Sequence, residues 1–167
     1  MRRALVIVLV LVLAVIPFPD GAQADCTDPA EPGVHWVHCL KNGLQLSTAN
    51  LEDARLSNSS FSRADLSGAN MRNIDGRRAK FVSANLAGVN LAGAILREAD
   101  FTSSNLSKAD LTGADLRDAA MFGADLREAN LTGARLDGAD FLNANLSGAI
   151  WTNGTTVCAA GSLGQCK

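Results

Sequence analysis

Aspartate, asparagine and histidine are the residue types in this sequence that could perform acid/base or metal chemistry. Asp or Asn recurs at every fifth position over most of the chain, as in Ala109-Asp110-Leu111. Such side chains bond to backbone N–H groups at turns, and recurrence along a whole repeat favours that role over a catalytic pair. His35 and His38 would share a metal ion only if their segment were helical, so surface or packing roles are favoured. The sequence therefore predicts no enzyme, metal or cofactor.

The segment 1–24 has the pattern of a secretory signal peptide. Arg2 and Arg3 precede an apolar run over positions 4–16, and a small-residue tripeptide ends at Ala24. The apolar run is shorter than the roughly 20 residues that span a bilayer, so we favour cleavage after Ala24 over a retained anchor. The expected mature chain is secreted or periplasmic, with no membrane span. Its 13 basic and 16 acidic residues give a net charge of −3, which offers no electrostatic case for binding nucleic acid.

A period of five dominates the rest of the chain. From Leu46 to Trp151, every position at this spacing holds a large apolar residue, except Gly76. A small or apolar residue, mostly Ala, stands two places before each. An α-helix would spread every fifth position around its circumference, so the period predicts short extended pieces joined by corners, with the large and small residues inward. Ile74 stands at the normally small position before Gly76 and is expected to fill the space there.

A slower period, four units long, predicts the shape of the coil. Phe occupies every fourth central position, with Met121 in the one missing place, so we expect four units per coil and a stack of aromatic side chains. At a spacing of about 4.8 Å, positions 44–153 would make about 5.5 coils and a rod about 26 Å long. Corner residues that tolerate the positive φ of a type II turn recur at the same spacing. They are Asn73, Gly93, Gly113, Gly133 and Asn153.

Two short segments flank the repeat, residues 25–43 and residues 154–167, and we expect them to cap its open strand edges. Cys26 and Cys39 lie in the first, and Cys158 and Cys166 in the second. Three pairings are formally open. Local pairing is favoured, and one zinc site for all four is disfavoured, because the rod should separate its ends by about 25 Å, against a disulfide Cα separation of about 6 Å. We therefore predict two local disulfides, in keeping with an oxidising compartment.

Residues one coil apart become neighbours in such a fold, so surface columns can be read from the sequence. Arg77, Arg97 and Arg117 form one column, a candidate anion-binding ladder for phosphate or sulfate groups of a polymer. Glu98 and Asp118 follow two of these arginines and are expected to neutralise them. A solvated, internally paired face is the competing interpretation.

Phe122 and Leu142 form a second column and are expected to project outward. Exposed apolar side chains in contact with each other are a candidate interface for a partner or for a homodimer. Scattered surface apolar residues are the competing interpretation.

The unit Ala-(Asp/Asn)-Leu-X-X, repeated in register over residues 44–153, resembles the pentapeptide-repeat family. The resemblance implies an all-β fold, a right-handed quadrilateral β-helix or solenoid. The best-known members bind DNA gyrase by imitating duplex DNA and protect it from quinolones. The leader and the small net charge favour another role for this chain, a secreted non-enzymatic scaffold that binds a protein or an anionic envelope polymer. A DNA mimic that binds gyrase is the alternative.

Overall fold

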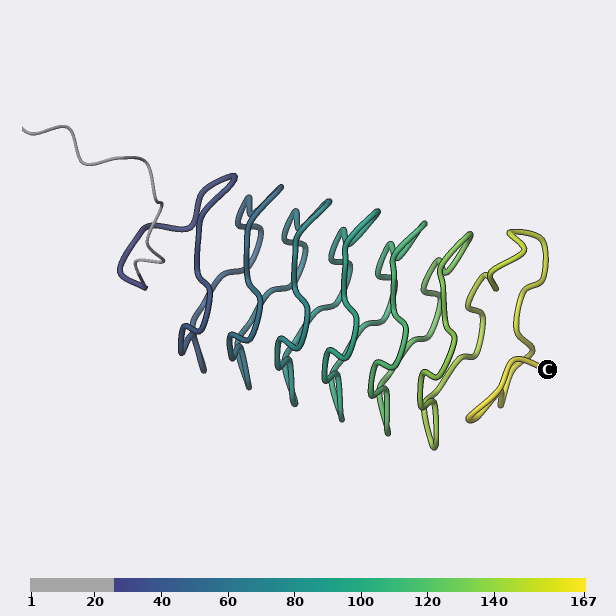
Figure 1. Cartoon of the computed structure of the whole chain (residues 1–167). Helices are drawn as coiled ribbons and strands as arrows, with labels where there is room; N and C mark the ends of the chain where they lie inside the picture. The colour runs from purple at the N-terminus through teal and green to yellow at the C-terminus, as the bar shows by residue number, and fades with distance from the viewer. Residues whose placement is uncertain (1–25) are drawn as a thin grey trace, which may run out of the picture.

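The described part of the protein, residues 26–167 of a computed structural model, is built from isolated β-bridges at regular intervals of five positions. It contains no helix and no continuous strand, and hence no helix long and apolar enough to cross a bilayer. The predicted signal peptide, residues 1–24, lies outside the described residues. The coils stack in one direction from the N-terminal to the C-terminal end (Figure 1), as a right-handed quadrilateral β-helix.

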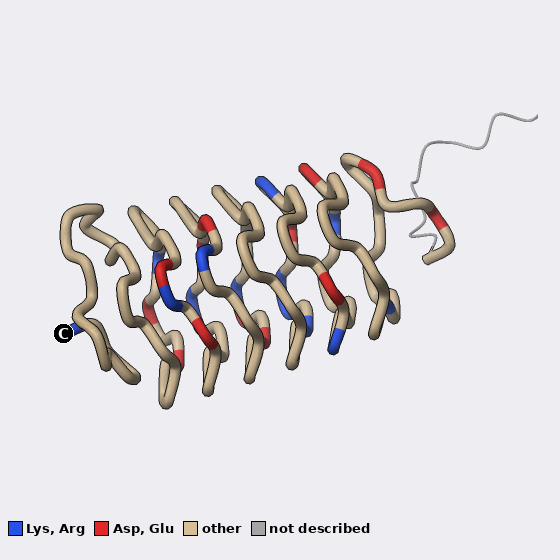
Figure 2. Tube along the Cα trace, turned by 180° about the vertical axis from the view of Figure 1, so that it is seen from behind, with Lys and Arg blue, Asp and Glu red and all other residues tan. Residues whose placement is uncertain are grey.

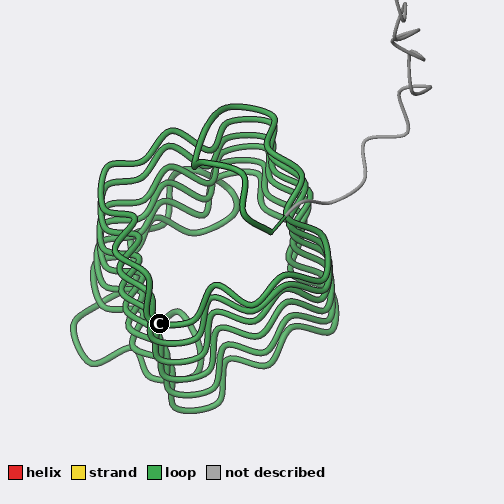
Figure 3. Ribbon diagram, turned by 90° about the vertical axis from the view of Figure 1, so that its left-hand side faces the viewer, coloured by secondary structure: helices red, strands yellow, loops and turns green. Residues whose placement is uncertain are grey.

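Each of the parallel bridges joins positions that differ by 20, which confirms four units per coil. Viewed along the stack, successive coils follow a common outline (Figure 3). The bridges run from His35↔Arg55 to Asn130↔Ile150. Residues 35–43 of the expected N-terminal cap therefore follow the same path as the repeat, although their sequence departs from its pattern.

Hydrogen bonds between coils pair the backbone N–H and C=O groups of the repeat units along the stack. In one unit, Phe81 N–H donates to Asp100 O (2.7 Å) and Ser83 N–H donates to Thr102 O (2.9 Å), both on the next coil. Ala84 N–H donates back to Phe81 O (3.0 Å) and closes the corner. The residue before that donor, Ser83, has φ of 55°, as a type II turn requires.

Positive φ at the corners is not confined to glycine and asparagine, since Asp, Glu, Ser, Thr, Arg and Lys also adopt it. Each such residue costs on the order of 1 kcal/mol in strain, which the hydrogen bonds between coils must offset. The prediction for Asn153 is wrong, because the positive φ there belongs to Gly154 (72°). Asn153 Oδ1 instead accepts the N–H groups of Thr155 and Thr156 at 3.1 and 2.9 Å, in a turn that leaves the repeat.

The core is a set of inward columns, and the predicted aromatic stack is one of them. The ring centroids of Phe61 and Phe81 lie 5.4 Å apart, and those of Phe81 and Phe101 lie 4.9 Å apart, with nearly parallel planes. Fully burying each such side chain stabilises the fold by roughly 1.5–3 kcal/mol. Small residues, mostly Ala, fill the alternate inward positions.

The N-terminal end is closed by side chains that replace the repeat residues. Lys41 occupies the position of the aromatic column in the first coil and is only 7% exposed. Its Nζ lies 3.7 Å from the ring centroid of Trp36 and donates to Cys26 O at 2.7 Å. These contacts stabilise a cation at the end of an apolar column. The Cys26–Cys39 disulfide, with Cα atoms 5.4 Å apart, holds the preceding segment against this coil.

The C-terminal segment folds back over the last coil. Two antiparallel bridges, Asn145↔Leu163 and Ile150↔Val157, pair it with the final repeat units. The Cys158–Cys166 disulfide closes the segment, with Cα atoms 4.8 Å apart. The structure thus contains both local disulfides that the sequence predicts.

Ile74 fills the core beside Gly76, as the sequence predicts. Both residues are buried, and a Cβ added to Gly76 would lie 3.0 Å from Leu96 Cδ2 and 3.4 Å from Ile74 Cδ1. No empty space is therefore left where the central side chain is missing.

We expect Ile74→Ala to lower the free energy of unfolding by about 2–5 kcal/mol, because it opens a cavity. Gly76→Leu alone should cost about 1–3 kcal/mol through overpacking. The double variant Ile74→Ala/Gly76→Leu restores the common pattern of the repeat and should lose less than the sum of the two. Urea unfolding of all four proteins measures this coupling, and additive losses would contradict the exchange of volume.

Candidate functional site

The recurrent Asp and Asn side chains support the corners, which confirms the structural interpretation. Asp100 Oδ1 accepts Thr102 N–H at 2.9 Å, and Asp65 Oδ1 accepts Ser67 N–H at 3.1 Å. Hydrogen bonds from the side chain and backbone of Ser67 hold the pKa of Asp65 below its ordinary value. The Asp65 carboxylate is thereby kept ionised as an acceptor. The recurrent carboxylates are spread along the rod instead of meeting at one point.

Two arginines of the predicted ladder are paired with the carboxylate two places earlier in the chain. Arg77 donates from Nε and Nη2 to the carboxylate of Asp75 at 2.9 and 2.5 Å. Arg117 makes the same two bonds to Asp115 at 2.7 and 2.5 Å. The hydrogen bonds from these guanidiniums are the main cause that lowers the pKa of each Asp below its ordinary value.

The expectation that Glu98 and Asp118 neutralise this column holds through charge only, because neither carboxylate bonds to the arginine before it. Glu98 does not bond to Arg97, and instead accepts Arg78 Nε at 2.9 Å across one coil. Asp118 acts on Arg117 through charge alone. Residues next to each other at a corner point in different directions, whereas residues two apart can meet, so the effective partners are Asp75 and Asp115.

Arg97 is the exception in the column. The residue two places before it is Ile95, which stands between Asp75 and Asp115 in the coil stack and cannot pair with a guanidinium. Within residues 26–167, the guanidinium of Arg97 makes no hydrogen bond and no ion pair. It helps to line a shallow hollow of about 400 Å³, which we call the Arg97 hollow. The lining residues are Ser57, Asn58, Arg77, Arg78, Arg97 and Glu98.

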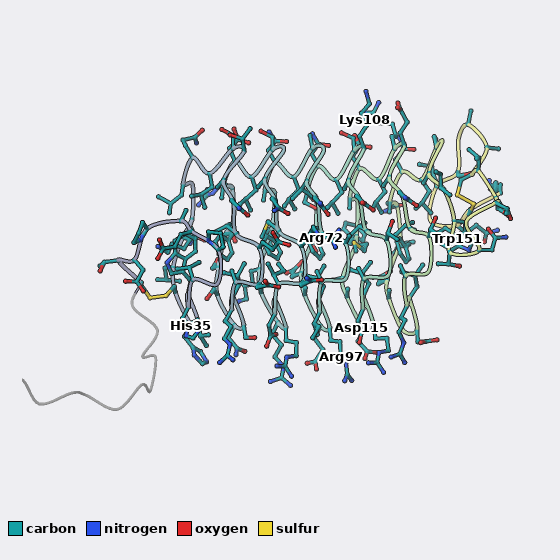
Figure 4. The ribbon with its side chains drawn as sticks, turned by 90° about the horizontal axis from the view of Figure 1, so that it is seen from above. His35, Arg72, Arg97, Lys108, Asp115 and Trp151 are labelled. Atoms are coloured by element: carbon teal, nitrogen blue, oxygen red, sulfur yellow. A yellow bond between two sulfur atoms is a disulfide. The ribbon has the colours of Figure 1, made fainter. Side chains whose placement is uncertain are left out.

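The Arg97 hollow lies on one long edge of the rod. Arg97 and Asp115 project from that edge, opposite Lys108 (Figure 4). Sequence reasoning identified the column of arginines but missed Ile95 as the residue that decides which of them is unpaired. The four-unit period contains that signal, because Ile95 interrupts a position held by Asp on both neighbouring coils.

Phe122 and Leu142 are exposed, at 42% and 59%, on consecutive coils. We call this pair the apolar corner. The same column carries Asn42, Ser62, Val82 and Thr102 on earlier coils, so large apolar side chains are concentrated toward the C-terminal end.

The histidines do not form a metal site of the kind considered from the sequence. Their segment is not helical, since His35 makes a parallel bridge and His38 lies at a corner with φ of 60°. In the described chain, no group of three or more His, Cys, Asp or Glu side chains lies close enough to hold a metal ion.

We expect Arg117→Gln to raise the pKa of Asp115 toward its ordinary value, as measured by carboxyl NMR titration. The folded pKa of Asp115 lies below its unfolded value, so the pair stabilises the fold above a pH of about 4, and this contribution is lost as the pH falls through the folded pKa. The variant should be slightly less stable than the unaltered chain at neutral pH and show a smaller further loss on acidification.

Arg127→Gln is the matched control, because Arg127 pairs with Asp125 in the same way on another column. It should raise the pKa of Asp125 toward its ordinary value and leave the pKa of Asp115 unchanged. A response of Asp115 to both substitutions would contradict a local pair.

A family model described as pentapeptide repeats matches eight copies, over residues 43–75, 79–118 and 114–150. No curated protein matches the sequence. The solved structure of HetL, a pentapeptide repeat protein involved in heterocyst differentiation regulation from the cyanobacterium Nostoc sp. strain PCC 7120, is similar. Its sequence is 31% identical over 75% of this chain and 63% of HetL, with a TM-score of 0.46.

Trypsin-treated QnrB1, a plasmid-mediated fluoroquinolone resistance protein, is also similar. It is 25% identical over 71% of this chain and 59% of QnrB1, with a TM-score of 0.56. The chain thus spans about three fifths of the length of these two solved proteins. The family match covers more than half of the chain and coincides with the coils of the structure, so the chain belongs to the pentapeptide-repeat family.

Proposed function

We propose that this protein is an extracytoplasmic, non-enzymatic scaffold that binds a partner protein through the apolar corner. Pentapeptide-repeat proteins generally serve as structural or binding scaffolds. The coil places outward side chains in fixed columns, so it can present a binding surface without reorganising. Two disulfides are in keeping with an oxidising compartment, which is where the sequence of residues 1–24 would direct the chain.

The observation that carries the proposal is the exposure of Phe122 and Leu142 on a column that is otherwise mostly polar. Side chains held about 4.8 Å apart by neighbouring coils present one continuous apolar strip. Burying such a strip against a partner would remove apolar area from water at little conformational cost, because the coils are already ordered. Aromatic side chains are also enriched where protein interfaces gain most of their affinity.

To test this proposal, the chain lacking residues 1–24 would be immobilised and exposed to envelope and secreted extracts. The double variant Phe122→Ser/Leu142→Ser should retain at most about a tenth of the bound partner, because both apolar contacts are lost. Val157→Ser is the matched control, since Val157 has the same exposure as Leu142, 59%, but belongs to the C-terminal segment. Equal losses in the two variants, or no loss in either, would contradict the proposal.

The same variants test the homodimer interpretation. Light scattering of the unaltered chain alone would show a dimer if the apolar corner binds a second copy, and the double variant would then be monomeric. A monomeric unaltered chain would contradict this interpretation.

A gyrase-binding DNA mimic is the second candidate function, favoured by the similarity to QnrB1. A DNA mimic needs a surface dominated by negative charge, whereas acidic and basic positions are interspersed along this rod (Figure 2). We therefore expect the chain lacking residues 1–24 to leave gyrase supercoiling unchanged, and to give no protection from a quinolone, at concentrations where a QnrB1 control acts. Inhibition or protection by this chain would favour the alternative.

A further inference from the structure

An Asp-x-Arg pair recurs on the surface of the rod and is broken at one place in the column of Arg77, Arg97 and Arg117. Three arginines bond through Nε and Nη2 to the carboxylate two places earlier, and the residues are Asp75 with Arg77, Asp115 with Arg117, and Asp125 with Arg127. Arg97 has Ile95 at the equivalent place. Its guanidinium is therefore left with donors that no carboxylate of the described chain occupies.

The Arg97 hollow also has an excess of positive charge. Arg77, Arg78 and Arg97 line it, and within residues 26–167 only the carboxylates of Asp75 and Glu98 bond to these guanidiniums. One positive charge thus remains uncompensated. Arg78 is the main cause that lowers the pKa of Glu98 below its ordinary value, and the charge of Arg97 adds to this effect.

The positive excess is confined to the coils around Arg97. One coil farther on, the charges of Asp137 and Asp118 act on Arg117, which is already bonded to Asp115. The column therefore cannot serve as a continuous ladder for a polyanion. Of the three arginines of this column, Arg97 is the one whose guanidinium has no carboxylate bonded to it within residues 26–167.

We propose that the Arg97 hollow binds a single, singly charged oxyanion, which accepts the guanidinium hydrogen bonds that Asp75 and Asp115 accept from Arg77 and Arg117. A planar guanidinium recognises carboxylate or phosphate oxygens through two parallel hydrogen bonds. A singly charged group neutralises the excess of one charge. Ser57 and Asn58 also line the hollow with polar side chains.

The shared ligand chemistry is a carboxylate or a phosphodiester, and both groups occur on envelope polymers. This inference deepens the proposed scaffold function by naming a second, anionic contact, but its test does not depend on the apolar corner. Binding of small anions needs no partner protein, so loss of the proposed protein contact would leave the anion result intact, and the reverse also holds.

Two probes test the site, acetate and dimethyl phosphate, each titrated into the chain lacking residues 1–24 at constant ionic strength set with sodium chloride. The NMR signal of the Arg97 Nε–H group is followed, since it reports the occupied guanidinium directly. We expect saturable shifts at Arg97 and not at Arg127, which is already paired. Whichever probe binds more tightly identifies the group, and a polyuronate and a poly(glycerol phosphate) then distinguish the two polymer sources.

Substitution of Ile95 gives the sharpest control, because Ile95 is 40% exposed and its replacement should leave the core intact. Ile95→Asp installs the carboxylate that pairs the other arginines, so it should weaken probe binding at least tenfold while Arg97 is still present. Ile95→Asn has the same shape without the charge and should bind within twofold of the unaltered chain. Arg97→Gln should weaken binding at least tenfold, and Arg127→Gln should not.

Absence of saturable binding by the unaltered chain would overturn the proposal. So would binding that survives Arg97→Gln, or equal effects of Ile95→Asp and Ile95→Asn. Urea unfolding of each variant establishes that a loss of binding is not a loss of fold.

Discussion

The hydrogen bonds between coils are the constraint on which the rest of this structure depends. Each unit donates and accepts along the axis to the coil above or below it, so the coil must close after four units for the bonds to align. That closure places like positions above one another and creates the aromatic stack inside and the surface columns outside. It also keeps non-glycine residues such as Ser83 at positive φ, since the neighbouring coils determine the backbone at every corner.

The same closure explains the electrostatics of the surface. Outward side chains two positions apart, such as Asp75 and Arg77, meet within one coil, and side chains one coil apart, such as Arg78 and Glu98, meet across coils. Exposed pairs of this kind contribute little to stability. Their greater effect is to occupy the guanidiniums of Arg77 and Arg117, so that within this column the guanidinium of Arg97 is left unbonded.

Much of the fold can be predicted from the sequence because the periods of five and of twenty residues determine both the backbone path and the packing of the core. The shorter period predicts the corners, the longer period predicts the aromatic stack, and both disulfides follow from the separation of the rod's ends. Ile74 and Gly76 could be predicted as a pair because an inward position has a definite volume. The continuation of the coils into the N-terminal segment could not be predicted, since Trp36 and Lys41 stand there in place of the usual repeat residues. The four-unit period marks Ile95 as an interruption beside the arginine column, but the choice of Asp75 and Asp115 as partners also depends on side-chain directions at the corners, which the period does not give.

The closure of the coil also restricts how such a chain can change in length. Insertion or loss of one repeat unit would turn everything beyond it by a quarter of a coil. Phe101 would then no longer lie beside Phe81, and Phe122 and Leu142 would move to another side of the rod relative to Arg97. Only insertion or loss of a whole coil keeps every column aligned. The apolar corner and the Arg97 hollow therefore keep their places around the axis only if the chain changes length by complete coils.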